Sequence, residues 1–336
     1  MMTRSLLSLL GSATLLLGTT PLIHAQVSGV PNNAANLSAE DILSRALERA
    51  AVQEEEGLEL TFEYFVESTA ERLDDEGVVT ETKTAKLHHY PLEELLYAEL
   101  IERDGETLDE NALREQHKRK TDFVRKAREH RARGETYEPN EMDIGFDYEL
   151  MDRYDTRLVR TESLRGHNCW VLGFTPREGK LPDRRRMDKA LNRSTGSLWI
   201  AQDDYGVARV AFEMQEPFKT LWGLVATLRH ATGQFDFDRI ADNLWAPTQI
   251  DLELDLRAFF RSIRRHVRQD WVEHRPIDGQ QQINHWISGD LVQNRSPNKY
   301  QFWVGASPLV STTGQQYAEP FARTAPAPSM SDCVHR

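Results

Sequence analysis

The stretch Gly196-Ser-Leu-Trp-Ile-Ala-Gln-Asp-Asp-Tyr-Gly-Val-Ala-Arg-Val-Ala-Phe-Glu-Met214 decides the predicted fold. Two runs rich in β-forming residues flank a polar turn at residues 203–206. The second run has an apolar face and a charged face, formed by Val210, Phe212 and Met214 and by Arg209 and Glu213 respectively. A period of two around a turn that contains glycine predicts an antiparallel hairpin with one wet face.

The same alternation recurs along the chain and predicts a sheet. It is clearest at residues 248–257, where apolar and charged side chains alternate: Ile250, Leu252, Leu254 and Leu256 against Asp251, Glu253, Asp255 and Arg257. Further strands are expected at residues 58–66, 78–90, 157–163, 168–175, 221–237 and 259–271. Another strand is expected at residues 95–103, although residues 93–100 fit a helix equally well.

Two helices are predicted among these strands. Ser38 begins the first, and Asp41 completes a capping box. Its apolar stripe consists of Ile42, Leu43, Ala46, Leu47, Ala50 and Ala51. The second helix, at residues 109–133, is charged, and its thin apolar stripe, which includes Leu113 and Phe123, predicts a position outside the core. A helical turn near Met187 is expected in the basic loop at residues 176–193.

The N-terminus is typical of a secretory signal. Arg4 precedes an apolar run at residues 6–17, which is too short to span a bilayer, and Ala25 is a small residue suited to cleavage. An uncleaved anchor is the alternative. Cleavage would make Gln26 the first residue and change the formal net charge from −12 to −13, because the segment contains one arginine. An acidic chain is a poor candidate for binding nucleic acid.

The rest of the chain is predicted to hold one domain. Residues 1–25 are the signal, 26–37 a linker, 38–272 the domain and 273–336 a mostly disordered polar tail, which contains six prolines and seven glutamines. Cys169 and Cys333 are the only cysteines, and neither is placed for an N-terminal lipid anchor. They could form a disulfide in an oxidising compartment. A buried free thiol at Cys169 is the simpler interpretation.

Motifs for catalysis are not found. The sequence has no Gly-x-Ser-x-Gly, no His-Glu-x-x-His, no phosphate-binding glycine loop and no Cys-x-x-Cys. His88 and His89 are neighbours in a strand, so they point to opposite faces and cannot share a metal ion. We therefore predict no catalytic residue, no metal, no cofactor and no enzymatic activity.

Charged clusters remain to be explained. Asp251, Glu253 and Asp255 share a strand face and could hold a cation. Pairing with basic residues of the next strand is the favoured alternative, and the candidates are Arg261, Arg264, Arg265 and Arg268. Basic loop residues are candidates for docking an anionic headgroup or an acidic partner, namely Arg184, Arg185 and Arg186. A solvated charged face is the competing interpretation.

The order of features across residues 145–271 resembles a known family. The run Arg165-Gly-His-Asn-Cys-Trp-Val-Leu172 leads to a basic loop, then to the hairpin at residues 196–214, and then to Leu244-Trp-Ala-Pro247. This pattern resembles the periplasmic outer-membrane lipoprotein-sorting proteins, the LolA/LolB-like family, over about residues 38–272. The resemblance implies an α+β fold: a strongly curved antiparallel sheet, or half-open β-barrel, with helices on its concave side and rim.

The resemblance also implies a function. The chain is expected to be a soluble periplasmic carrier or chaperone that binds the acyl chains of a lipid or lipoprotein and has no transmembrane segment once mature. Candidates for the cavity wall are Phe62, Tyr64, Phe212, Met214, Ile250, Leu252 and Leu254. The same residues would also suit a closed core. The alternative function is a periplasmic protein-binding or sensor module that uses this fold to contact a membrane-associated partner.

Overall fold

The computed structural model describes residues 37–135, 137, 146–183, 187–220, 226–258 and 261–277. The predicted signal, nearly all of the predicted linker and most of the predicted tail lie outside these ranges, as do Arg184, Arg185, Arg186 and Cys333. The helices and strands of the described residues belong to one compact unit that begins at Ser38.

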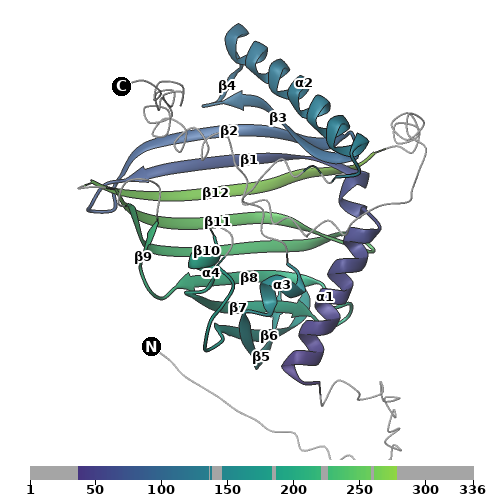
Figure 1. The fold of residues 1–336 in the computed structure, drawn as a ribbon, viewed down its shortest axis with the longest axis vertical. Coiled ribbons are helices and arrows are strands. Elements are labelled where there is room, and N and C mark those ends of the chain that lie inside the picture. Colours follow the sequence, from purple (N-terminus) through teal and green to yellow (C-terminus); the bar gives the residue numbers. More distant parts are fainter. Residues whose placement is uncertain are drawn as a thin grey trace, which may run out of the picture. The chain divides into compact units, whose positions relative to one another are not determined.

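Twelve strands of the described residues form one antiparallel sheet (Figure 1). They are β1 (Phe62–Leu73), β2 (Val79–Leu92), β3 (Leu95–Arg103), β4 (Glu106–Thr107), β5 (Tyr154–Leu164), β6 (His167–Pro176), β7 (Ser194–Ala201), β8 (Val207–Met214), β9 (Phe218–Thr220), β10 (Ala226–Ala241), β11 (Leu244–Ala258) and β12 (Arg261–Pro276). Their order is β4-β3-β2-β1-β12-β11-β10-β8-β7-β6-β5, with β9 beside β10. Because β4 and β5 end this order without pairing, the sheet stays open, and the predicted half-open antiparallel fold is confirmed.

The described residues also form four α-helices and one 3₁₀ turn. They are α1 (Ala39–Glu55), the 3₁₀ turn η2 (Leu58–Thr61), α2 (Glu110–Ala132), α3 (Tyr148–Met151) and α4 (Asp188–Leu191). The capping box of Ser38 and Asp41 begins α1 as predicted, and its stripe buries Ile42, Ala46, Leu47, Ala50 and Gln53. Figure 1 shows α1 crossing the ends of the strands.

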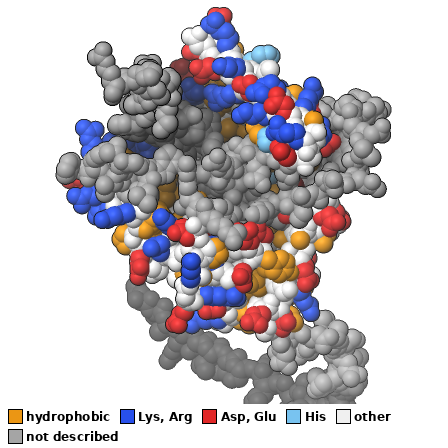
Figure 2. Space-filling model, viewed as in Figure 1, with side chains coloured by type: hydrophobic (Ala, Val, Ile, Leu, Met, Phe, Trp, Pro, Cys, Tyr) orange, Lys and Arg blue, Asp and Glu red, His pale blue; other side chains and the backbone are white. Residues whose placement is uncertain are grey.

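The α2 helix lies beside β3 and β4 at the edge of the sheet (Figure 1). Only Gln116, Phe123 and Ala127 are buried, which confirms its predicted position outside the core. Leu113, assigned to its apolar stripe, is instead 54% exposed. Figure 2 shows basic and acidic side chains interspersed along this helix.

The hairpin that predicted the fold is formed by β7 and β8. The register pairs Leu198 with Val210 and Gly196 with Phe212. Tyr205, rather than the glycine, adopts the left-handed conformation in the turn, with a φ of 64°. Gly206 has a different role, because a Cβ atom there would overlap the indole ring of Trp245.

The register gives the sheet an apolar face and a polar face. Residues on the apolar face form the main core, among them Tyr64, Val66, Phe235, Ile250, Leu252, Val267 and Trp271. The polar face carries a cross-strand row from Trp199 through Arg209, Asp236 and Gln249 to Asp270. Alternation predicted this division because successive strand residues point to opposite faces.

Two local predictions need correction. Residues 58–61 form the 3₁₀ turn η2 instead of the start of a strand, since Gly57 takes a left-handed conformation at its N-cap. The strand predicted at residues 78–90 continues further, because β2 runs to Leu92 and pairs Pro91 with Leu96. The ambiguous residues 93–100 form a turn at Glu93 and Glu94 followed by strand β3.

Candidate ligand cavity

A cavity of about 170 Å³ lies between α1 and the apolar face of the sheet. Its wall comes from α1, η2, β1, the β7–β8 turn and the adjoining ends of β10, β11 and β12. Apolar side chains that line it include Ala50, Phe62, Phe146, Phe237, Leu244 and Trp271. Helix and sheet therefore border a space, partly open to solvent, that neither fills.

One side of the cavity carries an aromatic stack. The ring of Tyr64 lies 5.0 Å from that of His89 and 5.2 Å from that of His274. Burial and the neighbouring charge of His88 lower the pKa of His89 to about 3, so this imidazole is neutral. Burial and the charge of Glu59 raise the pKa of Tyr64, so its phenol also stays neutral. Uncharged rings suit an apolar ligand.

Gln53 fixes α1 to the sheet. Its side-chain Nε2 donates to the backbone oxygen of Trp245 at 2.9 Å, and its Oε1 accepts from the backbone nitrogen of Trp245 at 3.0 Å. Gln53 is 5% exposed, so water cannot readily replace these two bonds. The Gln53 side-chain amide thus pairs with both the backbone N–H and the backbone C=O of Trp245, near the start of β11.

A group of charged and aromatic residues joins α1 to the β7–β8 turn. Arg45 donates to the Tyr205 hydroxyl at 2.6 Å, and Arg49 lies 3.7 Å from Asp204. The indole nitrogen of Trp245 also donates to Asp204, at 2.8 Å. The predicted polar turn therefore has a specific role, since it holds the helix over the cavity.

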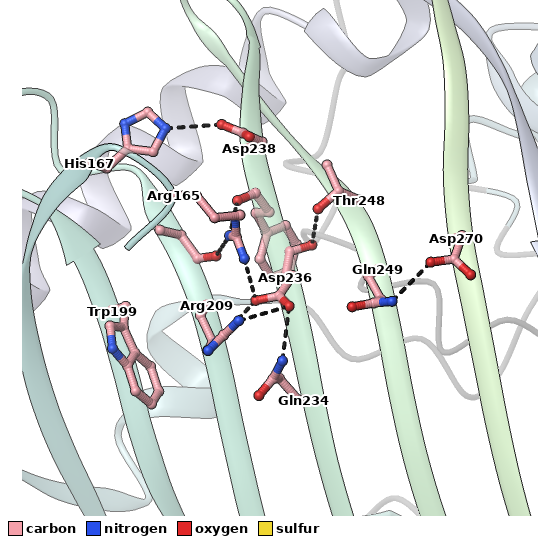
Figure 3. Close-up of polar contacts among 12 residues, drawn as sticks. Arg165, His167, Trp199, Arg209, Gln234, Asp236, Asp238, Thr248, Gln249 and Asp270 are labelled. Atoms are coloured by element: carbon pink, nitrogen blue, oxygen red, sulfur yellow. Dashed lines mark hydrogen bonds and ion pairs between the residues drawn. The ribbon is translucent and has the colours of Figure 1, made fainter. Parts of the chain in front are cut away.

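The polar face of the sheet carries a buried cluster of ion pairs on β8, β10 and the β5–β6 turn (Figure 3). Asp236, 4% exposed, accepts from Arg209 at 2.5 Å and pairs with Arg165 at 2.8 Å. Burial alone would raise the pKa of Asp236, but its bonds with the two arginines outweigh that effect and lower it. Arg165 also donates to the backbone oxygens of Ala208 and Phe237. The cluster therefore pins the β5–β6 turn against β8 and β10.

A histidine links three strands on the same face. His266 of β12 contacts Glu71 of β1 through Nδ1 and Asp251 of β11 through Nε2, both at 3.1 Å. Burial opposes its charge, but the hydrogen bonds to the two carboxylates outweigh burial and raise the pKa of His266. Asp255 pairs with Arg264 as predicted, whereas this histidine was not foreseen.

The predicted wall residues are divided between the cavity and the core. Phe62 and Tyr64 line the cavity. Ile250 and Leu252 are buried in the main core, and Phe212 packs against that core. Met214 is 4% exposed opposite Ser194, and Leu254 is partly buried opposite Ala231. The docking candidates Arg184, Arg185 and Arg186 lie outside the described residues.

Sequence reasoning missed the polar part of the site. Gln53 lies three residues after Ala50 on the predicted stripe, so its helical phase could have placed it on the buried face. Trp245 belongs to the run Leu244-Trp-Ala-Pro247, which supported the family resemblance but indicated no contact for the tryptophan. Trp271 and His274 of β12 also line the cavity. The sequence could not show this, because alternation does not distinguish a residue that lines a cavity from one in a packed core.

Cys169, His88 and His89 do not line the cavity. Cys169 is a buried free thiol, and burial raises its pKa to about 11. His88 and His89 do face opposite ways, because His88 contacts Glu63 while His89 packs on Tyr64. Within the part of the chain that the structure describes, no group of three or more potential ligands could hold a metal ion. No helix there is long and apolar enough to cross a membrane.

These features define an open antiparallel sheet with a helix-covered cavity. Comparisons with known proteins found several solved structures with limited similarity to the chain. No family model and no curated protein match the sequence. A LolA superfamily protein from Nitrosomonas europaea is 14% identical over 72% of this chain and 95% of its own, with a TM-score of 0.27.

Two further structures are similar to the chain. A domain named for outer membrane lipoprotein sorting, from Vibrio parahaemolyticus, is 12% identical over 74% of this chain and 98% of its own, with a TM-score of 0.29. The MucA/MucB complex of Pseudomonas aeruginosa gives 11% identity over 70% of this chain and 98% of the matched chain, with a TM-score of 0.23. Two of these structures carry names of the family that the sequence resembles. At identities of 11–14% and TM-scores of 0.23–0.29, they assign no family and no role to this chain.

Proposed function

We propose that the protein is a non-enzymatic periplasmic carrier that binds the acyl part of a lipid or lipoprotein beneath α1 for outer-membrane sorting. The observation that carries this proposal is the cavity between α1 and the apolar sheet face. The N-terminal signal pattern supports an exported protein. Neutral aromatic rings and apolar side chains provide the wall that a hydrocarbon requires.

The size of the cavity sets a condition on how it is used. A cavity of roughly 150 Å³ holds one benzene-sized molecule, and the space beneath α1 is similar, at about 170 Å³. It therefore accommodates a short alkyl segment, and an outward movement of α1 would supply the additional room for a complete long acyl chain. Release would follow the same movement in reverse, as the helix returns to its anchors on Trp245 and Asp204.

A cavity-filling variant tests the proposal. Ala50 lines the cavity from α1, whereas Ala51 is exposed on the same helix. Ala50→Phe should weaken binding of a fluorescent fatty-acyl probe at least about tenfold by occupying the space. Ala51→Phe, the matched control, should bind like the natural sequence. Equal binding by all three proteins, with circular dichroism showing folded chains, would refute a ligand site beneath α1.

The bound molecule itself provides a second test. The protein is purified from its native envelope without detergent, extracted with organic solvent and analysed by mass spectrometry. The expected result is one acyl lipid or lipoprotein per chain, reduced in Ala50→Phe. An extract free of acyl compounds from a properly folded protein argues against a carrier.

A protein-binding module remains the second candidate, and α2 is the observation that favours it. This helix carries eight Lys and Arg residues and four Asp and Glu residues on a mostly exposed surface (Figure 2). Such a surface suits an acidic partner. Delipidated protein would then capture a specific envelope protein, and reversal of Lys118 and Lys126 to glutamate would abolish capture while probe binding persists.

A further inference from the structure

Arg49 carries the positive charge of the cavity wall. Among the described residues that line the cavity, it is the only lysine or arginine. Its Nη2 is buried without a hydrogen bond and lies 3.7 Å from Asp204. Within the described part of the chain, its Nε and Nη1 also make no hydrogen bond, and these two atoms are not buried. The guanidinium therefore presents accessible donors at the cavity wall.

Asp204 does not depend on Arg49 for its charge balance. Its Oδ2 accepts from the Trp245 indole at 2.8 Å and pairs with Arg239 at 3.1 Å. Its Oδ1 accepts from the backbone nitrogen of Gly206 at 2.9 Å. If Arg49 turned to a ligand, this carboxylate would keep three partners and would not become a buried unpaired charge. The long contact between Arg49 and Asp204 can therefore be exchanged for a ligand.

The carboxylates of the wall lie toward the other end of the cavity. Glu54 is in the last turn of α1, Glu59 in η2 and Glu94 in the turn between β2 and β3. Arg49 instead faces the β7–β8 turn, and β1, β12, β11 and β10 separate β2 from β8 in the sheet (Figure 1). These acids also have partners, since Glu94 lies 3.9 Å from Arg131 and neither of the other two is free. The end of the cavity at Arg49 therefore favours a negative group.

We propose that Arg49 is the head-group anchor of the cavity, and that the ligand is an acyl amphiphile with an anionic oxygen, as in a carboxylate or a phosphate. This inference rests on the proposed function, because it assigns the class of ligand to the same cavity. The acyl chain lies beneath α1, and the guanidinium donates to the oxygens of the head group. Two parallel hydrogen bonds of this kind give an arginine a specific preference for such groups.

The test compares ligands that share an octyl chain and differ in their polar end. Octanoate, octyl phosphate, octanol and octylamine compete with a fluorescent apolar probe at neutral pH and low salt. The natural sequence should bind at least one of the anions about tenfold more tightly than octanol, the effect expected of one charge-assisted pair. The preferred anion identifies a carboxylate or a phosphate as the head group. Binding of octanol or octylamine as tight as that of both anions would overturn the assignment.

Two arginines of α1 provide matched variants. Arg49→Met removes the charge but keeps a long side chain, so the preferred anion should bind like octanol, while octanol binding changes less than about threefold. Arg49→Gln gives the same test if Arg49→Met does not fold. Arg45→Met is the control and should keep the anion preference, because it changes the net charge equally at a residue that bonds Tyr205 and does not line the cavity.

The outcomes separate the anchor from the cavity as a whole. An anion preference that persists in the Arg49 variants, or that Arg45→Met removes to the same extent, refutes the head-group anchor alone. Failure of every ligand to displace the probe from the natural sequence refutes the proposed function and the anchor with it.

Discussion

Replacing Gln53 with alanine tests whether the helix over the cavity depends on one amide. The change removes both bonds to the Trp245 backbone and leaves a buried N–H and a buried carbonyl unsatisfied. Each such group costs about 1–3 kcal/mol. Partial entry of water into the shortened site lowers the sum, so we expect α1 to be destabilised by about 3 kcal/mol.

Native-state hydrogen exchange measured by mass spectrometry is the appropriate assay, because α1 can open without global unfolding. In Gln53→Ala, amides of α1 should exchange about a hundredfold faster, as about 3 kcal/mol implies. Amides of β1 and β12 should change much less. Val52→Ala is the matched control, since Val52 is the preceding residue and is 48% exposed. Equal protection of α1 in both variants, or a loss spread evenly over the sheet, would refute the reasoning.

The remaining predictions concern the groups that support this helix and the sheet beneath it. Gly206→Ala should lower the free energy of unfolding by about 3 kcal/mol, because the new Cβ displaces the Trp245 indole; in a Trp245→Leu background the penalty measured in urea should nearly vanish. The pKa of His266 is raised in the folded state, so its contribution to stability is complete below about pH 6.5 and is lost as the pH rises through the folded-state value. His266→Gln should therefore be less stable than the natural sequence below about pH 6.5, and the difference should shrink as the pH rises above that value. Asp236→Ala should lower the free energy of unfolding by about 3–5 kcal/mol, because it leaves Arg165 and Arg209 without their shared carboxylate. Asp236→Asn should lower it by less. Equal losses of stability in the two variants would contradict the role given to the charge.

Local sequence signals predicted local structure well. Ser38 and Asp41 marked the start of α1, and the alternation at residues 248–257 marked a half-buried strand. These signals succeed because helix caps and strand faces depend on residues a few positions apart. They failed at residues 58–61, where the left-handed backbone of Gly57 turned an alternating pattern into η2.

The candidate site was harder to predict because its parts are distant in the sequence. Gln53 of α1 and Trp245 of β11 are 192 positions apart, and they meet only in the folded sheet, where α1 packs near the start of β11. Alternation tells which side chains share a face, but it does not reveal which strands are neighbours. Phe62 and Ile250 therefore looked equivalent in the sequence, although one lines the cavity and the other lies in the core.

Under the proposed function, the polar contacts that anchor α1 have a consequence for ligand selection. An acyl chain that needs the space occupied by α1 would displace the helix and break an anchor worth about 3 kcal/mol. Each methylene group transferred from water gains about 0.8 kcal/mol, so about four further buried methylenes offset that loss. A ligand shifts the helix only through such a difference in affinity between the closed and open states. Short alkyl ligands would therefore bind with α1 closed, and long acyl chains would hold it open, which relates the length of the cargo to the position of the helix.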